Sequence, residues 1–227
     1  MQLNFDSFVL AAATADLADA DDPVAREHAD AVEFRMDLSE ADPLEALEAY
    51  DGDLPIIATN RAAWEGGEAE EEGRLEALVE ATAVDAVAAI DVELESILEG
   101  DADEVLEAAR ERDVAVIASS HDFEGTPPRG EMVKTLTEAG KYADVAKLAV
   151  TAESNADALA LLSATEQLTF HGASVATMAM GEAGSHTRAV APVYGSRIGY
   201  APVDPADATA PGQYDLETLA ELVAKLQ

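Results

Sequence analysis

The chain has 227 residues, with 47 Asp and Glu against 13 Lys and Arg, which gives a formal net charge of −34. This excess of acid excludes binding to nucleic acids or anionic membranes by bulk attraction, because polyanions repel one another. Hydrophobic residues make up 48% of the chain and form compact runs, which excludes a disordered protein. Cysteine is absent, so disulfides and thiolate metal sites are excluded as well.

The cellular setting follows from the same composition. No apolar run is long enough to span a bilayer, and no basic segment precedes the first apolar run, so we expect a cytoplasmic protein. The acid excess extends along the whole chain, and such a surface repels itself unless salt screens it. At molar salt the screening length falls to about 3 Å. The composition therefore predicts adaptation to a salt-rich cytoplasm, as in halophilic archaea.

Apolar, β-branched runs alternate along the chain with acidic amphipathic stretches. Strands are predicted, in chain order, over residues 8–14, 31–37, 54–60, 86–94, 114–121, 144–151, 168–180 and 190–202. Helices are predicted over residues 16–28, 43–50, 68–83, 103–112, 130–139, 155–164 and 215–226, with a weak helical signal around 181–188.

The alternation predicts an α/β fold with a parallel sheet, because parallel neighbours need long crossover connections. An open doubly wound sheet would need a Gly-rich turn after its first strand to hold a nucleotide. Residues 14–19, Thr-Ala-Asp-Leu-Ala-Asp, contain no glycine and present carboxylates that repel phosphate. We therefore expect a single-domain (β/α)8 TIM barrel over residues 1–227.

Polar residues recur near the ends of successive predicted strands, where a barrel carries its active site. They are Arg35, Arg61, Glu93, His121 and Lys147, spaced by 26, 32, 28 and 26 residues. In the second predicted strand Glu33, Arg35 and Asp37 share one face, so three charges should point into the barrel. They could form a closed internal ion-pair network or bind a ligand.

Lys147 lies in an apolar strand of a chain that has only four lysines. Burial should favour its neutral amine, which can attack a carbonyl carbon and form a Schiff base. The alternative is a structural ion pair with a barrel carboxylate such as Glu93. His121 ends the preceding strand and should therefore lie beside Lys147, as a general acid and base beside a nucleophile. No His-x-x-x-His spacing occurs, so we expect neither a metal nor another cofactor.

These residues resemble the type I 3-dehydroquinate dehydratases, Schiff-base barrels of the shikimate pathway of aromatic amino acid biosynthesis. The resemblance covers most of the chain and occurs in family order at strand ends. The matching stretches are Glu-Phe-Arg-Met-Asp at 33–37, Arg-Ala-Ala-Trp-Glu-Gly-Gly at 61–67, Ser-Ser-His-Asp-Phe at 119–123 with Thr126 and Pro127, Ala-Asp-Val-Ala-Lys at 143–147, Met-Ala-Met-Gly at 178–181 with Arg188, and Ala-Pro-Gly-Gln at 210–213.

The resemblance implies a mechanism and a homodimer. Lys147 would form an imine with the C3 ketone of 3-dehydroquinate, and His121 would remove a C2 proton and then protonate the departing C1 hydroxyl. Glu65 would support the histidine. By the same resemblance, Glu33, Arg35 and Arg61 would bind the ring hydroxyls of the substrate, and Arg188 and Gln213 would bind its carboxylate. Thr209, which replaces a serine common in the family, would make a further substrate contact. Met178 and Met180 would line the site or pack in the core.

Two other functions are compatible with a lysine in a barrel. A class I aldolase would share Lys147 but would need phosphate-binding Gly-rich loops after the last two strands, where the sequence offers only weak candidates. A non-catalytic barrel that binds small acids would make the pairing of His121 with Lys147 accidental.

Overall fold

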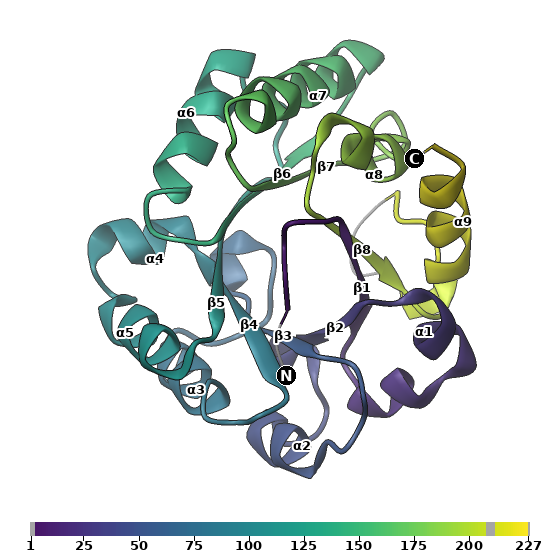
Figure 1. Cartoon of the computed structure of the whole chain (residues 1–227). Helices are drawn as coiled ribbons and strands as arrows, with labels where there is room; N and C mark the ends of the chain where they lie inside the picture. The colour runs from purple at the N-terminus through teal and green to yellow at the C-terminus, as the bar shows by residue number, and fades with distance from the viewer. Residues whose placement is uncertain (1–2, 208–211, 227) are drawn as a thin grey trace.

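Eight parallel strands form the centre of the molecule (Figure 1). The computed structural model describes residues 3–207 and 212–226. Strands that follow one another in sequence pair with one another from β1 to β7, and β8 pairs with β1. The strands are β1 Val9–Thr14, β2 Ala31–Arg35, β3 Ile56–Thr59, β4 Val87–Glu93, β5 Ala115–Asp122, β6 Val145–Thr151, β7 Val175–Met180 and β8 Ile198–Pro202. The predicted (β/α)8 barrel is confirmed.

The barrel closes between β7 and β8 by a few hydrogen bonds instead of a ladder of paired residues. The backbone N–H of Arg197 donates to the carbonyl of Val175 over 2.8 Å. The N–H of Thr177 donates to the Ser196 hydroxyl over 3.0 Å, so a side chain replaces one backbone partner. These bonds satisfy backbone groups that an open edge would leave exposed.

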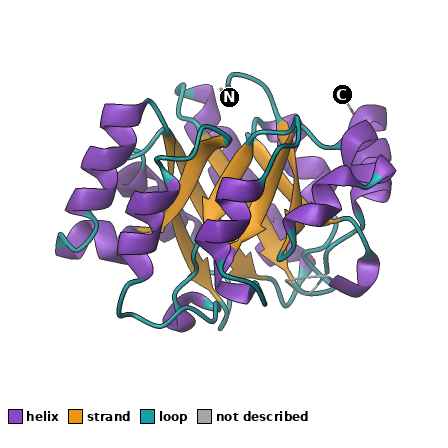
Figure 2. Cartoon of the chain, turned by 90° about the horizontal axis from the view of Figure 1, so that it is seen from below, coloured by secondary structure: helices purple, strands orange, loops and turns teal. Residues whose placement is uncertain are grey.

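Helices surround the strands on the outside (Figure 2). They are α1 Pro23–His28, α2 Pro43–Ala49, α3 Arg74–Ala81, α4 Leu94–Glu99, α5 Asp103–Arg112, α6 Arg129–Ala139, α7 Asn155–Phe170, α8 Thr187–Val190 and α9 Leu216–Leu226. Asp22 and Asp42 are the N-cap residues of α1 and α2, and each directly precedes a proline in the first turn of its helix. None of the helices in the described part of the chain is long and apolar enough to cross a membrane.

Several elements differ from the sequence prediction, among them the helix α3, which begins at Arg74 instead of residue 68. Residues 168–170 continue α7 instead of starting a strand, because Leu168 packs on its buried face and Thr165 bonds back to the Leu161 carbonyl over 2.9 Å. Residues 190–194 are helical, and the last strand begins only at Ile198. The short helix α4 directly after β4 has no counterpart in the prediction. In these segments, runs of apolar and β-branched residues suggest strands, but tertiary packing overrides their β-propensity.

Two apolar layers position the mouth of the barrel. Outside the strands, Phe34, Ile90 and Leu161 belong to a large core between sheet and helices. Inside the strands, a second cluster includes Ile57 and Ile198, and Phe5 joins it from the segment before β1. The interior is therefore a packed core, and polar side chains are concentrated at the carboxyl ends of the strands.

Candidate active site

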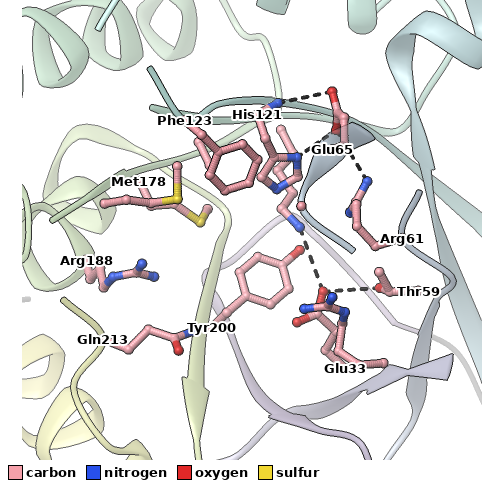
Figure 3. Close-up of a pocket in the computed structure, with 15 residues that line it drawn as sticks. Glu33, Thr59, Arg61, Glu65, His121, Phe123, Met178, Arg188, Tyr200 and Gln213 are labelled. Carbon is pink, nitrogen blue, oxygen red and sulfur yellow. Dashed lines mark hydrogen bonds and ion pairs between the residues drawn. The ribbon is translucent and has the colours of Figure 1, made fainter. Parts of the chain in front are cut away.

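A pocket of about 560 Å³ opens at the carboxyl ends of the strands. It brings together eight residues that the sequence singles out, from elements far apart in the chain (Figure 3). These are Glu33, Arg35, Arg61, Glu65, His121, Lys147, Arg188 and Gln213. Met178 and Met180 also line it while belonging to the interior apolar cluster, so both implied roles hold. Thr209 lies outside the described residues.

Lys147 reaches this pocket from below. It is the third residue of β6, in register with Ser119, so it lies deeper than the strand end expected from the sequence. Its residue is 5% exposed, and its Nζ lies 2.8 Å from Asp91 Oδ2 and 3.8 Å from Glu33 Oε1. The carboxylate partner is therefore Asp91 rather than the predicted Glu93. Sequence reasoning missed Asp91, although the alternation Asp91-Val-Glu93 marks both as facing the interior.

Arg61 links the carboxylates beneath the pocket. It donates to Asp91 over 2.8 Å, to Glu93 over 3.0 Å and to the Ser119 hydroxyl over 2.6 Å. Glu93 also accepts a hydrogen bond from buried Arg74. Burial by itself would lower the pKa of Arg61, but the surrounding carboxylates raise it well above its usual value. Burial would likewise raise the pKa of Asp91, and the neighbouring cations overcome this and lower it.

The second strand supplies two of the three charges expected inside the barrel. Glu33 points inward and accepts a hydrogen bond from Thr59 over 3.1 Å. Arg35 lines the pocket and donates two hydrogen bonds to the Asp37 carboxylate, of 2.8 and 2.6 Å. Asp37 itself does not continue the strand, because β2 ends at Arg35 and a 3-10 turn follows. Its role is to orient Arg35, which the two-residue period of a strand could not show.

His121 and Glu65 form a hydrogen-bonded pair at the pocket wall. His121 Nδ1 lies 2.8 Å from Glu65 Oε2, and the backbone N–H of His121 donates to Glu65 Oε1 over 3.2 Å. Burial lowers the pKa of His121 well below its usual value, with Arg61 and Lys147 contributing. Burial raises the pKa of Glu65 to about 8, against the opposing charge of Arg61.

Burial keeps His121 neutral at neutral pH, because it disfavours the charged imidazolium and lowers the pKa of the ring. Nδ1 is engaged by Glu65, so Nε2 is the nitrogen that remains for a ligand. When Nδ1 carries the imidazole proton and donates a hydrogen bond to Glu65, Nε2 has a free lone pair and can accept a proton, as a general base must.

This pair predicts a pH-dependent effect of Glu65→Gln on stability. The pKa of Glu65 is raised on folding, so its contribution to stability is present below about pH 4.5 and is lost as pH rises through about 8. The free energy of unfolding of the wild type, relative to the variant, should therefore fall over this range. The limiting slope for one proton is about 1.4 kcal/mol per pH unit.

Urea unfolding of both proteins from pH 4.5 to 8.5 measures this difference. The matched control is Glu221→Gln, which changes an exposed glutamate that pairs with Lys225. Its difference from the wild type should be flat above pH 5.5. A flat difference for Glu65→Gln as well would show that Glu65 is ionised in the folded protein.

Arg188 brings a buried positive charge to the opposite side of the pocket. It is 5% exposed, lies in α8, and forms no ion pair with any carboxylate in the described part of the chain. Its Nε is buried without a hydrogen-bond partner. Burial lowers its pKa to about 10, offset a little by Tyr214. A buried cation without a counterion favours an anionic ligand, and an arginine suits a carboxylate best.

Two aromatic side chains complete the pocket: Phe123, which lies in one of the matching stretches without an assigned role, and Tyr200, which the sequence analysis did not single out. Phe123 stacks on His121, with ring centroids 6.0 Å apart and an interplanar angle of 11°. Gly66 makes room for it: its φ is +79°, and a Cβ there would lie 2.3 Å from the Phe123 ring. Tyr200 of β8 lies under Lys147, whose Nζ is 4.3 Å from the ring centroid. Within residues 3–207 and 212–226, no cluster of three or more His, Asp or Glu side chains is placed to hold a metal ion.

The fold and the site are those of a TIM-barrel enzyme. One pocket holds a buried lysine, a histidine–carboxylate pair and the guanidinium of Arg188, which has no ion-pair partner among the described residues. The family model described as type I 3-dehydroquinase matches residues 8–227. The chain is 57% identical over 230 residues to the 3-dehydroquinate dehydratase of Haloarcula marismortui, covering 99% of each chain. It is 52% identical over 229 residues to that of Halobacterium salinarum, covering 99% of this chain and 100% of the relative.

Solved structures give the same result. The crystal structure of the 3-dehydroquinate dehydratase of Geobacillus kaustophilus is 30% identical and superposes with a TM-score of 0.86, covering 98% of this chain and 92% of the other. The chain therefore belongs to the type I 3-dehydroquinase family. The family resemblance found in the sequence is confirmed, and the relatives from halophilic archaea agree with the acid-rich composition.

Proposed function

We propose that this chain, as one catalytic domain, dehydrates 3-dehydroquinate to 3-dehydroshikimate in the shikimate pathway. Lys147 adds to the C3 ketone, and loss of water from the carbinolamine gives an iminium ion. His121 takes a proton from C2, and the iminium accepts the electron pair. His121 returns the proton to the C1 hydroxyl, which leaves as water, and hydrolysis of the iminium releases the product and the amine. The net change is loss of one water.

The proposal rests mainly on the placement of Lys147. It is a buried amine at the base of a pocket that also holds His121 with Glu65 on one wall and the unpaired cation Arg188 on another. In the structure the amine is paired with Asp91, so it must lose a proton before it attacks. Neutral His121 lines the same pocket and can accept that proton.

The remaining pocket residues would hold the substrate. Arg188 and Gln213 would bind the carboxylate, because a desolvated cation without a counterion gains most from an anion. Glu33 and Arg35 would bind ring hydroxyls from the other side, and the family resemblance implies a further substrate contact from Thr209. Arg61 has the same implied role, but its hydrogen bonds to Asp91, Glu93 and Ser119 favour a structural contribution beneath the substrate.

A relative supports the covalent step. The type I 3-dehydroquinate dehydratase of Clostridium difficile, whose structure contains covalently modified comenic acid, is 27% identical to this chain with a TM-score of 0.82, covering 97% of this chain and 92% of that one. The acid in that structure is thus in a covalently modified form. The presence of a buried lysine in the pocket of this chain is consistent with the same chemistry here.

The test combines product formation with trapping of the intermediate. The purified protein in 2 M KCl is given 3-dehydroquinate, and the rise in ultraviolet absorbance of the conjugated product is followed. A second sample is treated with borohydride and substrate, and its mass is measured. A product signal with a substrate-dependent adduct supports the proposal. Carbon–carbon cleavage would indicate the aldolase instead, and binding without product or adduct would indicate a non-catalytic barrel.

We further propose that the protein works in the cytoplasm as a homodimer. The family resemblance is the basis for the dimer, and several large apolar side chains are exposed on the outer helices, among them Leu159 and Phe170 at 65% and 79% exposure. Sedimentation analysis in 2 M KCl measures the mass directly. A monomer at micromolar concentration would contradict the dimer.

Salt should strongly stabilise this protein. With a net charge of −34, folding brings carboxylates together, and their repulsion opposes folding where salt is dilute. The melting temperature should rise steeply between about 0.1 and 1 M KCl, where the screening length shrinks from about 10 to 3 Å, and more slowly above that. Thermal melts in KCl, with sucrose of matched osmolality as control, measure this. A melting temperature independent of KCl would contradict salt adaptation.

A further inference from the structure

Tyr200 is a pocket residue to which neither the sequence motifs nor the mechanism above assigns a role. It lies in β8, is 4% exposed, and lines the pocket together with Lys147 and Glu33. Figure 3 shows its ring in the middle of the site, among the side chains of the other residues that line the pocket. The phenol therefore reaches the region in which Lys147 would bind a ligand.

The hydroxyl of Tyr200 is buried and has no hydrogen-bond partner among the described residues. Other hydroxyls in the described part of the chain have partners: the half-buried Tyr50 donates to the Leu54 carbonyl over 2.9 Å, and the buried Thr165 and Thr177 bond to each other over 2.6 Å. A buried hydroxyl without a partner destabilises the folded state, whereas phenylalanine would fill the same space without that cost. The oxygen atom of Tyr200 is thus not explained by folding.

The surroundings of Tyr200 keep its proton in place. Burial raises the pKa of its phenol well above the usual value, and the carboxylates Glu33 and Asp91 raise it further. A neutral phenol can donate one hydrogen bond and accept others. The nearest cation, Lys147, lies over the ring face, with Nζ 4.3 Å from the centroid. A carbon atom bonded to Nζ would therefore lie beside the phenol.

We propose that the Tyr200 hydroxyl is a further substrate-binding group, which donates a hydrogen bond to a substrate oxygen on, or next to, the carbonyl carbon that Lys147 attacks. This inference rests on the proposed function, because it places the substrate carbon at Nζ. The bound substrate supplies the partner that the protein itself lacks. The ring meanwhile holds the lysine in position through its face, which phenylalanine could also do.

Tyr200→Phe tests the inference, because it removes one oxygen atom and keeps the ring. A hydrogen bond between neutral groups corresponds to about 2- to 12-fold in an equilibrium or rate constant. We expect kcat/KM to fall about fivefold or more, while the melting temperature stays the same or rises. If Tyr200 bonds the substrate already in the ground state, loss of the hydroxyl raises KM. If it bonds mainly the carbinolamine, loss of the hydroxyl lowers kcat.

Tyr50→Phe is the matched control, because its hydroxyl bonds to a backbone carbonyl far from the pocket. It should show the opposite pattern, a lower melting temperature with unchanged kcat/KM. The inference is overturned if Tyr200→Phe keeps kcat/KM within twofold of the wild type. It is also overturned if the melting temperature of Tyr200→Phe falls as that of Tyr50→Phe does, since the hydroxyl would then be partnered within the protein.

Borohydride trapping separates this inference from the proposed function. If the wild type forms a reducible adduct with 3-dehydroquinate and Tyr200→Phe has normal kcat/KM, only the role of Tyr200 fails. If the wild type forms no adduct and no product, the proposed function fails and the inference fails with it. If Tyr200→Phe forms the adduct more slowly than the wild type at substrate concentrations below KM, the inference is supported.

Discussion

Lys147→Ala should abolish borohydride trapping and lower turnover by several orders of magnitude. The variant lacks the only amine that lines the described pocket, so no imine can form and the C2 proton is no longer acidified by an electron sink. Folding should survive, because Asp91 keeps its bond to Arg61 when the lysine is gone. Mass spectrometry after reduction and the ultraviolet assay measure the two effects.

The other lysines provide the control. Lys134 and Lys141 lie on the exposed side of helix α6 and just after it, and changing either to alanine should leave trapping and turnover unchanged. Lys147→Met retains the apolar stem of the side chain and separates loss of the amine from loss of packing. A reducible adduct that persists in Lys147→Ala would show that another amine is the nucleophile.

His121→Ala should reduce turnover on the order of 10²-fold or more while changing substrate affinity much less. Imine formation and proton abstraction are separate steps, so the variant should still react with the substrate at Lys147, although more slowly because His121 no longer takes the proton of the amine. The iminium would then accumulate before dehydration. The adduct trapped from this variant should therefore be heavier by one water than an adduct formed with the product.

His171→Ala is the control for the histidine, because His171 lies exposed at the end of α7, next to Phe170. Its turnover should match the wild type. If His121→Ala turns over normally, His121 does not take part in the reaction, and its pairing with Glu65 is structural.

The repeating pattern of the chain was sufficient to predict the barrel and five of the residues that line the pocket, whereas Glu65, Arg188 and Gln213 followed only from the family resemblance. Strand-end polar residues recur at the spacing of one βα unit, so Arg61, His121 and Lys147 could be assigned to one mouth before any coordinates were known. The secondary-structure prediction fails where the local composition favours one element and tertiary packing favours another. The end of α7 has strand-like composition, yet Leu168 is held in a helix by its contacts with the core.

The partners of buried charges could not be predicted from the sequence. Whether Lys147 meets Asp91 or Glu93 depends on the tilt and register of neighbouring strands, which one-dimensional spacing does not contain. Tyr200 was missed for a similar reason, since a single aromatic residue in a short strand is indistinguishable from core. Only the geometry shows that its oxygen faces the pocket without a protein partner.

A network of buried ion pairs at the base of the pocket should make the local electric field insensitive to the salt concentration of the solution. The network consists of Lys147, Asp91, Arg61, Glu93 and Arg74. Mobile ions screen charges that they can surround, and these side chains are at most 5% exposed. Each of these charges lies beside an oppositely charged side chain, and Glu33 near Lys147 supplies the third carboxylate for the three cations. The outer surface of the molecule thus responds to salinity, whereas the electric field acting on the reacting atoms is set by the protein itself.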